Sequence, residues 1–155
     1  MKPLISVIYA SRATEQFHEH EIPELLKQAR LANARQELTG MLLYIDGSFL
    51  QVLEGQPDRV EAMFAAILLD KRHCQITLIA RETILERAYE GWTLIHKTLD
   101  PVEAGELIEQ PDYFHSSAWI AAPDPSRAKK LLAAASKQWQ MEHHTGKYRT
   151  LGRSA

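Results

Sequence analysis

The chain has 155 residues, 45% hydrophobic and 25% charged, which is the composition of an ordinary globular protein. Its length suits one domain with a short extension, and at this size about 70% of the unfolded chain's surface can be buried without stabilising disulfides or metals. The net charge of −2 argues against a nucleic acid or an anionic membrane as a partner. We expect the positive charges near the end, Lys147, Arg149 and Arg153, to belong to a solvated terminus.

The single cysteine, Cys74, allows no disulfide within the chain, which is typical of the reducing cytosol. We therefore expect a cytoplasmic protein. No run approaches the roughly 20 apolar residues of a membrane span. The apolar run at residues 4–10 is rich in β-branched and aromatic residues, which favours a buried strand over a signal peptide. The histidines lack carboxylate or cysteine neighbours at metal-ligand spacing, so we expect no metal site.

The first predicted elements are a strand at residues 4–11 and a helix at residues 21–35. Pro23 fits only in the first turn of a helix, so the helix should begin there. Five residues follow helical spacing and predict one buried stripe: Ile22, Leu25, Leu26, Ala29 and Asn33. An asparagine at the end of this stripe either bonds the terminal carbonyl groups of the helix or faces a ligand.

A hairpin follows, with strands at residues 38–45 and 48–54 separated only by Asp46 and Gly47. Pro57 begins a second helix, which should end near residues 70–73. Its apolar stripe is predicted to consist of Val60, Met63, Phe64, Ile67 and Leu68. Two further strands are predicted at residues 75–83 and 91–98.

This order of elements predicts an α+β fold of the ferredoxin-like βαββαβ type with one additional strand, that is, a mixed five-stranded sheet. Each crossover is expected to give parallel neighbours and the hairpin antiparallel ones, with both helices on one face. After residue 100 we expect a helix with a capping box of Asp100 and Glu103, and then a helix capped by Asp124. We expect this helical extension, residues 100–155, to cover the other face of the sheet formed by residues 1–99.

Gln51 is the least expected residue of the third strand, because its neighbours at residues 49–53 are all apolar. A buried amide without hydrogen-bond partners costs about 1–3 kcal/mol. The amide therefore either has static partners in the core or faces a ligand.

Six motifs together point to one family. In chain order they are IYASR at residues 8–12, ARLAN at 29–33, LTGMLLY at 38–44, GSFLQVLEG at 47–55, DKRH at 70–73 and WTL at 92–94. Over about residues 3–98 the chain resembles the BLUF domains, which sense blue light with a bound flavin. Each motif alone is weak, but six motifs in this order and spacing are specific.

The resemblance implies a flavin between the two helices, with FAD expected and FMN or riboflavin as alternatives. It implies that Tyr9 transfers an electron and a proton after light absorption and that Gln51 then changes its amide orientation or tautomer. It also implies that Trp92 helps to pass the signal outward. The residues implied to bind the cofactor, together with Gln51, are Leu25, Arg30, Asn33, Phe49, Ile67, Asp70, Arg72 and His73.

The chain departs from the family pattern at a few positions. Leu94 stands where a methionine is common, and leucine is stiffer than a thioether side chain. Ala29 stands where a hydroxyl residue is frequent, which removes one polar group. The first departure puts the route of the signal in doubt, whereas light absorption should survive it.

We therefore expect a blue-light photoreceptor without enzymatic activity that signals to a downstream protein or through a change of homo-oligomer. One alternative is a small flavin-dependent enzyme, such as a reductase, on the same scaffold. A second alternative is an interaction module that kept the fold and lost the flavin. The chain offers no Ser/His/Asp set and no phosphate-binding glycine loop to favour the enzyme.

Overall fold

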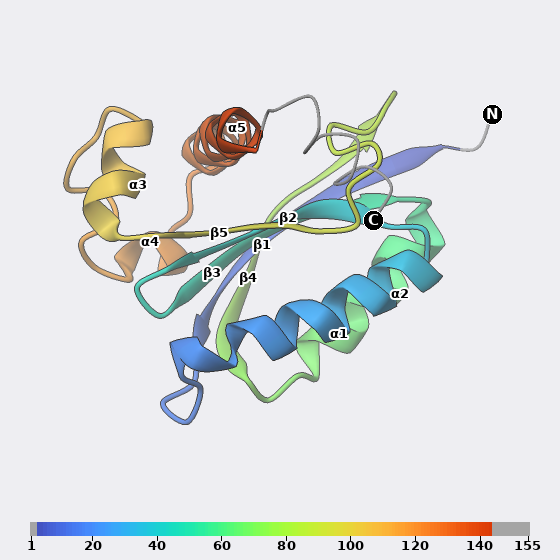
Figure 1. The fold of residues 1–155 in the computed structure, drawn as a ribbon, viewed down its shortest axis with the longest axis horizontal. Coiled ribbons are helices and arrows are strands. Elements are labelled where there is room, and N and C mark those ends of the chain that lie inside the picture. The colour runs from blue at the N-terminus through green and yellow to red at the C-terminus, as the bar shows by residue number, and fades with distance from the viewer. Residues whose placement is uncertain (1–2, 144–155) are drawn as a thin grey trace.

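The computed structural model describes residues 3–143, so the predicted solvated terminus around Lys147 lies outside the described residues. Within them the chain forms a five-stranded sheet with helices on both faces (Figure 1). The strand order is β4-β1-β3-β2-β5. The strands are β1 (Leu4–Ala13), β2 (Thr39–Ile45), β3 (Ser48–Gly55), β4 (His73–Ile84) and β5 (Ile95–Leu99).

The α+β, ferredoxin-like sheet is confirmed, but the neighbours of the crossover strands differ from the prediction. β1 pairs antiparallel with both β3 and β4, and β2 pairs antiparallel with β3. The strand after each crossover is not adjacent to the strand before it, because β3 inserts between β1 and β2, and β1 inserts between β3 and β4. Among the described strands, only β2 and β5 are parallel neighbours.

The helices divide between the two faces as predicted. Two of them, α1 (Ile22–Arg35) and α2 (Pro57–Leu68), cover one face of the sheet (Figure 1). The extension forms α3 (Pro101–Leu107), α4 (Ala118–Ala121) and α5 (Pro125–Glu142), which lie on the other face. A 3₁₀ turn at Glu19–Glu21 precedes α1.

Each face of the sheet has its own core, because successive strand residues point to opposite sides. Val7 of β1 packs with residues of α2, whereas Ile8 packs with residues of α5. The core on the α5 side contains four residues of α5 that follow helical spacing: Ala128, Leu131, Leu132 and Ala135. Trp139, which continues this apolar stripe, packs against the core while remaining partly exposed.

The predicted helix caps are present. The Asp100 side chain accepts a hydrogen bond of 2.8 Å from the Glu103 backbone N–H, and the Glu103 side chain accepts one of 3.1 Å from Asp100. Asp124 accepts a bond of 3.2 Å from the Arg127 backbone N–H at the start of α5. These bonds satisfy backbone donors that a helix start leaves without partners.

Several details of the predicted elements were wrong. Leu68 is 50% exposed rather than buried, and α2 ends there instead of near residues 70–73. The last strand begins at Ile95 instead of residue 91. Side chains of α1 hold the backbone before it, since Asn33 Nδ2 donates to Thr93 O at 2.8 Å and Arg30 Nε donates to Leu94 O at 3.1 Å.

Candidate functional site

A cavity of about 240 Å³ lies between α1, α2 and the sheet. Polar side chains stand on its floor and at its mouth, and apolar side chains form its walls. Nine of the residues predicted from the family resemblance line this cavity: Tyr9, Leu25, Asn33, Phe49, Gln51, Ile67, Asp70, Arg72 and His73.

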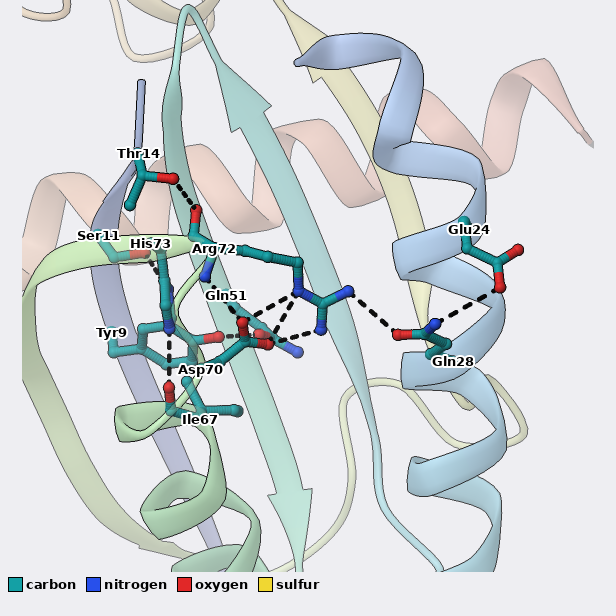
Figure 2. A network of polar contacts seen from close by, with 10 residues as sticks. All are labelled: Tyr9, Ser11, Thr14, Glu24, Gln28, Gln51, Ile67, Asp70, Arg72 and His73. Carbon is teal, nitrogen blue, oxygen red and sulfur yellow. Dashed lines mark hydrogen bonds and ion pairs between the residues drawn. The ribbon is translucent and has the colours of Figure 1, made fainter. Parts of the chain in front are cut away.

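The floor of the cavity is a pair of facing residues on adjacent antiparallel strands. Tyr9 of β1 and Gln51 of β3 are register partners, and the Tyr9 hydroxyl donates a hydrogen bond to Gln51 Oε1 (Figure 2). Tyr9 is 3% exposed and Gln51 is 6% exposed. Within the described part of the chain, Gln51 Nε2 donates no hydrogen bond. The amide therefore has one end bound to the phenol and one donor left for a ligand.

The environment of Tyr9 keeps its phenol protonated. Burial raises the pKa of Tyr9 above its usual value of 10.0, and the negative charge of Asp70 raises this pKa further. The ring packs against Phe64, with a centroid distance of 5.5 Å. A neutral phenol can act as a hydrogen-bond donor to the amide, which a phenolate cannot.

Asn33 lies at the inner end of α1 and is 2% exposed. One of its two N–H donors is used internally, by the bond to Thr93 O. Its Oδ1 accepts no hydrogen bond from the described residues, although the side chain lines the cavity. An amide oxygen that faces the cavity can accept a hydrogen bond, so this position suits a ligand that donates one.

The mouth of the cavity carries an ion pair in the segment after α2, and a hydrogen bond connects this pair to α1. Arg72 Nη2 lies 2.6 Å from Asp70 Oδ2, and Arg72 Nη1 donates to Gln28 Oε1 at 3.1 Å (Figure 2). The hydrogen bonds from Arg72 hold the pKa of Asp70 below its usual value of 3.8. Asp70 and Arg72 thus neutralise each other and place hydrogen-bonding groups at the open side of the site.

His73 lines the cavity, but both ring nitrogens are occupied by protein groups. Nδ1 lies 2.8 Å from the Ser11 hydroxyl, and Nε2 lies 2.8 Å from Ile67 O (Figure 2). His73 therefore ties β1 to the end of α2 and has no nitrogen free for a ligand. The sequence analysis missed Ser11, which is fully buried beneath this histidine.

Small side chains give the cavity its width, and two of them, Ala32 and Ala66, were not predicted from the sequence. Ala29 and Ala32 of α1 face Ala66 of α2 across the site. Helical spacing contained the signal, since Ala66 lies three residues after Met63 and one before Ile67 on the inner side of α2. Alanine at these positions leaves room for a flat group between the helices.

Two of the predicted site residues lie outside the cavity. Arg30 is exposed and bonds the backbone of Leu94. Trp92 packs on the α5 side of the sheet, where its ring meets that of Trp139 edge-on at a centroid distance of 5.0 Å. Leu94, by contrast, is buried in the core on the α1 side together with Leu42.

Comparison with known proteins identifies the family. A family model described as sensors of blue light using FAD (BLUF) matches residues 4–95. The chain belongs to the BLUF family. Its BLUF region is 34% identical over 96 residues to the photoactivated adenylate cyclase subunit beta of Euglena gracilis. The aligned residues make up 61% of this chain and 11% of that protein. It is 33% identical over 73 residues to the blue light- and temperature-regulated antirepressor BluF of Escherichia coli. These residues make up 47% of this chain and 18% of the antirepressor.

Solved BLUF structures share the fold over most of the chain. The dark-state structure of BlrB, a BLUF protein, has a TM-score of 0.66 at 27% identity and covers 88% of this chain and 98% of BlrB. The photo-activated state of BlsA has a TM-score of 0.70 at 22% identity, covering 84% of this chain and 92% of BlsA, and supports the fold alone. The chain spans about a tenth of the cyclase subunits that it matches, so their activity does not transfer to it.

The residues of the cavity fit a flavin, the cofactor of BLUF domains. A flavin ring is flat, with apolar faces and polar edges, and the cavity has apolar walls and the amide groups of Gln51 and Asn33, each of which makes one hydrogen bond within the protein and keeps further hydrogen-bonding capacity. Within residues 3–143, no group of three or more histidine, cysteine, aspartate or glutamate side chains is arranged to hold a metal ion. Across that same range, every helix is too short or too polar to cross a membrane.

Proposed function

We propose that the chain is a cytoplasmic blue-light receptor in which Tyr9 and Gln51 act on a flavin, FAD, bound between α1 and α2. The observation that carries this proposal is the buried Tyr9–Gln51 pair with an amide donor directed to no other described residue. The cavity volume of about 240 Å³ lies below the range of roughly 300–1,000 Å³ typical of whole small-molecule sites. It therefore suits the ring of the flavin, with the rest of the cofactor beyond the mouth.

A bound flavin would supply the absorption of blue light and an electron acceptor. Tyr9 would donate one electron together with its hydroxyl proton and would take both back afterwards, so that the phenol is restored. In the dark, Tyr9 holds this proton against Gln51 Oε1. Gln51 then reorients or tautomerises, because loss and return of the phenolic proton remove and restore the partner of Oε1. The two ends of the amide have similar shape and opposite hydrogen-bonding character. Reorientation of the amide therefore exchanges the donor and the acceptor that the cavity presents to its ligand.

The other residues of the site position the cofactor. Asn33 presents its Oδ1 to the polar edge of the flavin ring. Apolar contacts with the two faces of the ring come from Leu25, Phe49 and Ile67. Asp70 and Arg72 stand at the mouth, where a charge-assisted bond to the ribityl or phosphate side is available. Arg30 and His73 support this arrangement through the protein rather than by contact with the ligand. Arg30 lies outside the cavity and bonds the backbone of Leu94, and both ring nitrogens of His73 are bound to protein groups.

The proposed output lies on the opposite face. Residues 1–99 form the sensor and residues 100–155 the output region, with Trp92 on the output side because it packs against Trp139 of α5. We propose that the chain forms a homo-oligomer and acts through a separate protein, without enzymatic activity of its own. Its similarity to BlrB, a BLUF protein that is 27% identical and covered to 98% of its length, supports a receptor role for this chain.

The decisive test is the absorption spectrum of the purified protein in the dark and after blue illumination. We expect a yellow protein with a reversible red shift, which Gln51→Leu abolishes because the amide is lost. Gln16→Leu is the matched control, since Gln16 is exposed in the turn after β1 and does not line the cavity. A yellow protein without a shift would contradict the receptor proposal, and turnover of NADH would favour a reductase instead. Mass spectrometry of the released cofactor distinguishes FAD from FMN and riboflavin.

A further inference from the structure

We propose that Glu54 is a positioning residue that couples the strand carrying Gln51 to the β4–β5 connection and thereby to α5. This inference rests on the proposed light-receptor function and adds a route for its signal. It is carried by a buried hydrogen-bond cluster on the side of the sheet opposite the flavin cavity.

Glu54 lies near the end of β3, three residues beyond Gln51, or about 10 Å along the strand. Alternation along the strand places the two side chains on opposite faces. Glu54 is 2% exposed. Its carboxyl group accepts three hydrogen bonds, from Thr39 Oγ1 at 2.9 Å, the Ala88 backbone N–H at 2.7 Å and the Tyr89 backbone N–H at 3.0 Å.

These bonds tie the β4–β5 connection directly to β3. Two successive backbone N–H groups of the connection bind one carboxyl group, an arrangement that fixes both sides. Arg87, in the same connection, reinforces the attachment by donating to Thr39 Oγ1 at 3.0 Å, Glu54 O at 3.2 Å and Glu37 O at 2.9 Å. Loss of these donors would leave the carboxyl group buried without partners, which costs free energy. The connection should therefore move together with β3.

The connection in turn contacts α5. Tyr89 is 6% exposed and packs in the core formed with α5, where its hydroxyl meets that of Ser136. A hollow of about 450 Å³ lies beside this contact and is lined by Glu54, Tyr89 and Ser136. The hollow leaves α5 space to shift when the connection pulls on Tyr89. Glu54 thus provides a link from Gln51 to α5 that does not pass through Trp92.

The test compares hydrogen–deuterium exchange in the dark and under blue light for the full chain. We expect the unmodified protein to show a light-dependent change of exchange in residues 85–94 and 125–142. Glu54→Gln should keep the flavin and the red shift, because the side chain points away from the cavity. The same substitution should reduce the light-dependent change in residues 125–142 about fivefold or more, the lower end of typical allosteric coupling. Tyr89→Phe should act in the same direction.

Glu61→Gln is the matched control, since Glu61 forms a surface ion pair with Arg81 and does not contact the β4–β5 connection. Full retention of the α5 response in both Glu54→Gln and Tyr89→Phe would overturn the coupling. The coupling would also be overturned if the unmodified protein showed the red shift but no light-dependent change of hydrogen exchange in α5. This second outcome would leave the receptor function intact. If Glu54→Gln fails to bind flavin, Thr39→Val decides by the same criteria, because it removes only one of the three donors to the carboxyl group.

Discussion

The phenol of Tyr9 is the residue on which the proposed photochemistry depends, and two effects act on it in the same direction. Burial comes first and the Asp70 charge second, and both raise its pKa. An ordinary tyrosine already stays protonated until a pH of about 10. The hydrogen bond from Tyr9 to Gln51 should therefore be independent of pH throughout the neutral range.

A pH series tests this conclusion. A tyrosine whose folded-state pKa is raised stabilises the folded protein fully below its unfolded value, and this stabilisation is lost as the pH rises above it. We expect the amplitude of the red shift to stay constant from about pH 6 to 9 and to fall only above about pH 10. A midpoint inside the neutral range, with an unchanged far-ultraviolet circular dichroism spectrum, would show that Tyr9 is not held as described.

Gly40 offers a prediction about stability. A Cβ added at Gly40 would stand 2.0 Å from Val52 O of the adjacent strand, so Gly40→Ala must push β2 and β3 apart. We expect a loss of about 3 kcal/mol in the free energy of unfolding, measured by urea denaturation. Gly91→Ala is the control, since no atom lies within 4 Å of its added Cβ and only its positive φ of 84° causes strain. Equal losses in the two variants would contradict the close contact at Gly40.

At the scale of elements, local signals in the sequence were sufficient for most helices and strands. Proline at helix starts, the Asp46-Gly47 turn and the capping residues act within a few positions, so they can be recognised without the fold. The strand order could not be obtained in this way, because β3 inserts between β1 and β2 through pairing of distant segments. The start of β5 was misplaced for a similar reason, since Asn33 and Arg30 hold its preceding backbone from another element.

The candidate site shows the same division. The family resemblance predicted nine residues that line the cavity, and seven of them lie in the six motifs, because each motif carries its residues to a fixed place in the fold. They did not predict that His73 has both ring nitrogens bound within the protein, or that Trp92 turns toward α5. Both features depend on contacts between residues far apart in the chain, which spacing alone does not reveal.

The contact between Trp92 and Trp139 should contribute to the attachment of α5. Edge-to-face aromatic pairs contribute about 0.5–1.5 kcal/mol beyond the area that they bury. A double-mutant cycle with Trp92→Leu, Trp139→Leu and the double variant measures this coupling by urea denaturation. We expect a coupling energy within that range, and additive effects to within about 0.3 kcal/mol would show that the two rings do not interact.

At the scale of the whole molecule, apolar residues pack on both faces of the sheet, in one cluster on the α5 side and two on the α1 and α2 side. The core on the α1 and α2 side holds the cavity, and the core on the α5 side contains Ile8, Met41, Leu43, Leu50 and Val52 of the sheet. The light-sensing residues and the extension therefore share the same strands through opposite faces. This arrangement allows a change at Gln51 to reach α5 without any large movement of the chain.

The same arrangement predicts that residues 1–99 do not fold stably alone, although they contain the whole flavin site. Removal of the extension would expose one apolar face of the sheet, and large exposed apolar patches lead to association or unfolding. We expect the fragment to aggregate in size-exclusion chromatography or to lose cooperative unfolding. In the full chain, Leu131→Ala should cost about 2–5 kcal/mol, because Leu131 is fully buried against that face. Met141→Ala, at a residue that is 71% exposed on the same helix, should change stability by less than about 0.5 kcal/mol. A monomeric fragment that unfolds cooperatively at the same urea concentration as the full chain would show that the extension is an accessory to the sensor rather than part of its core.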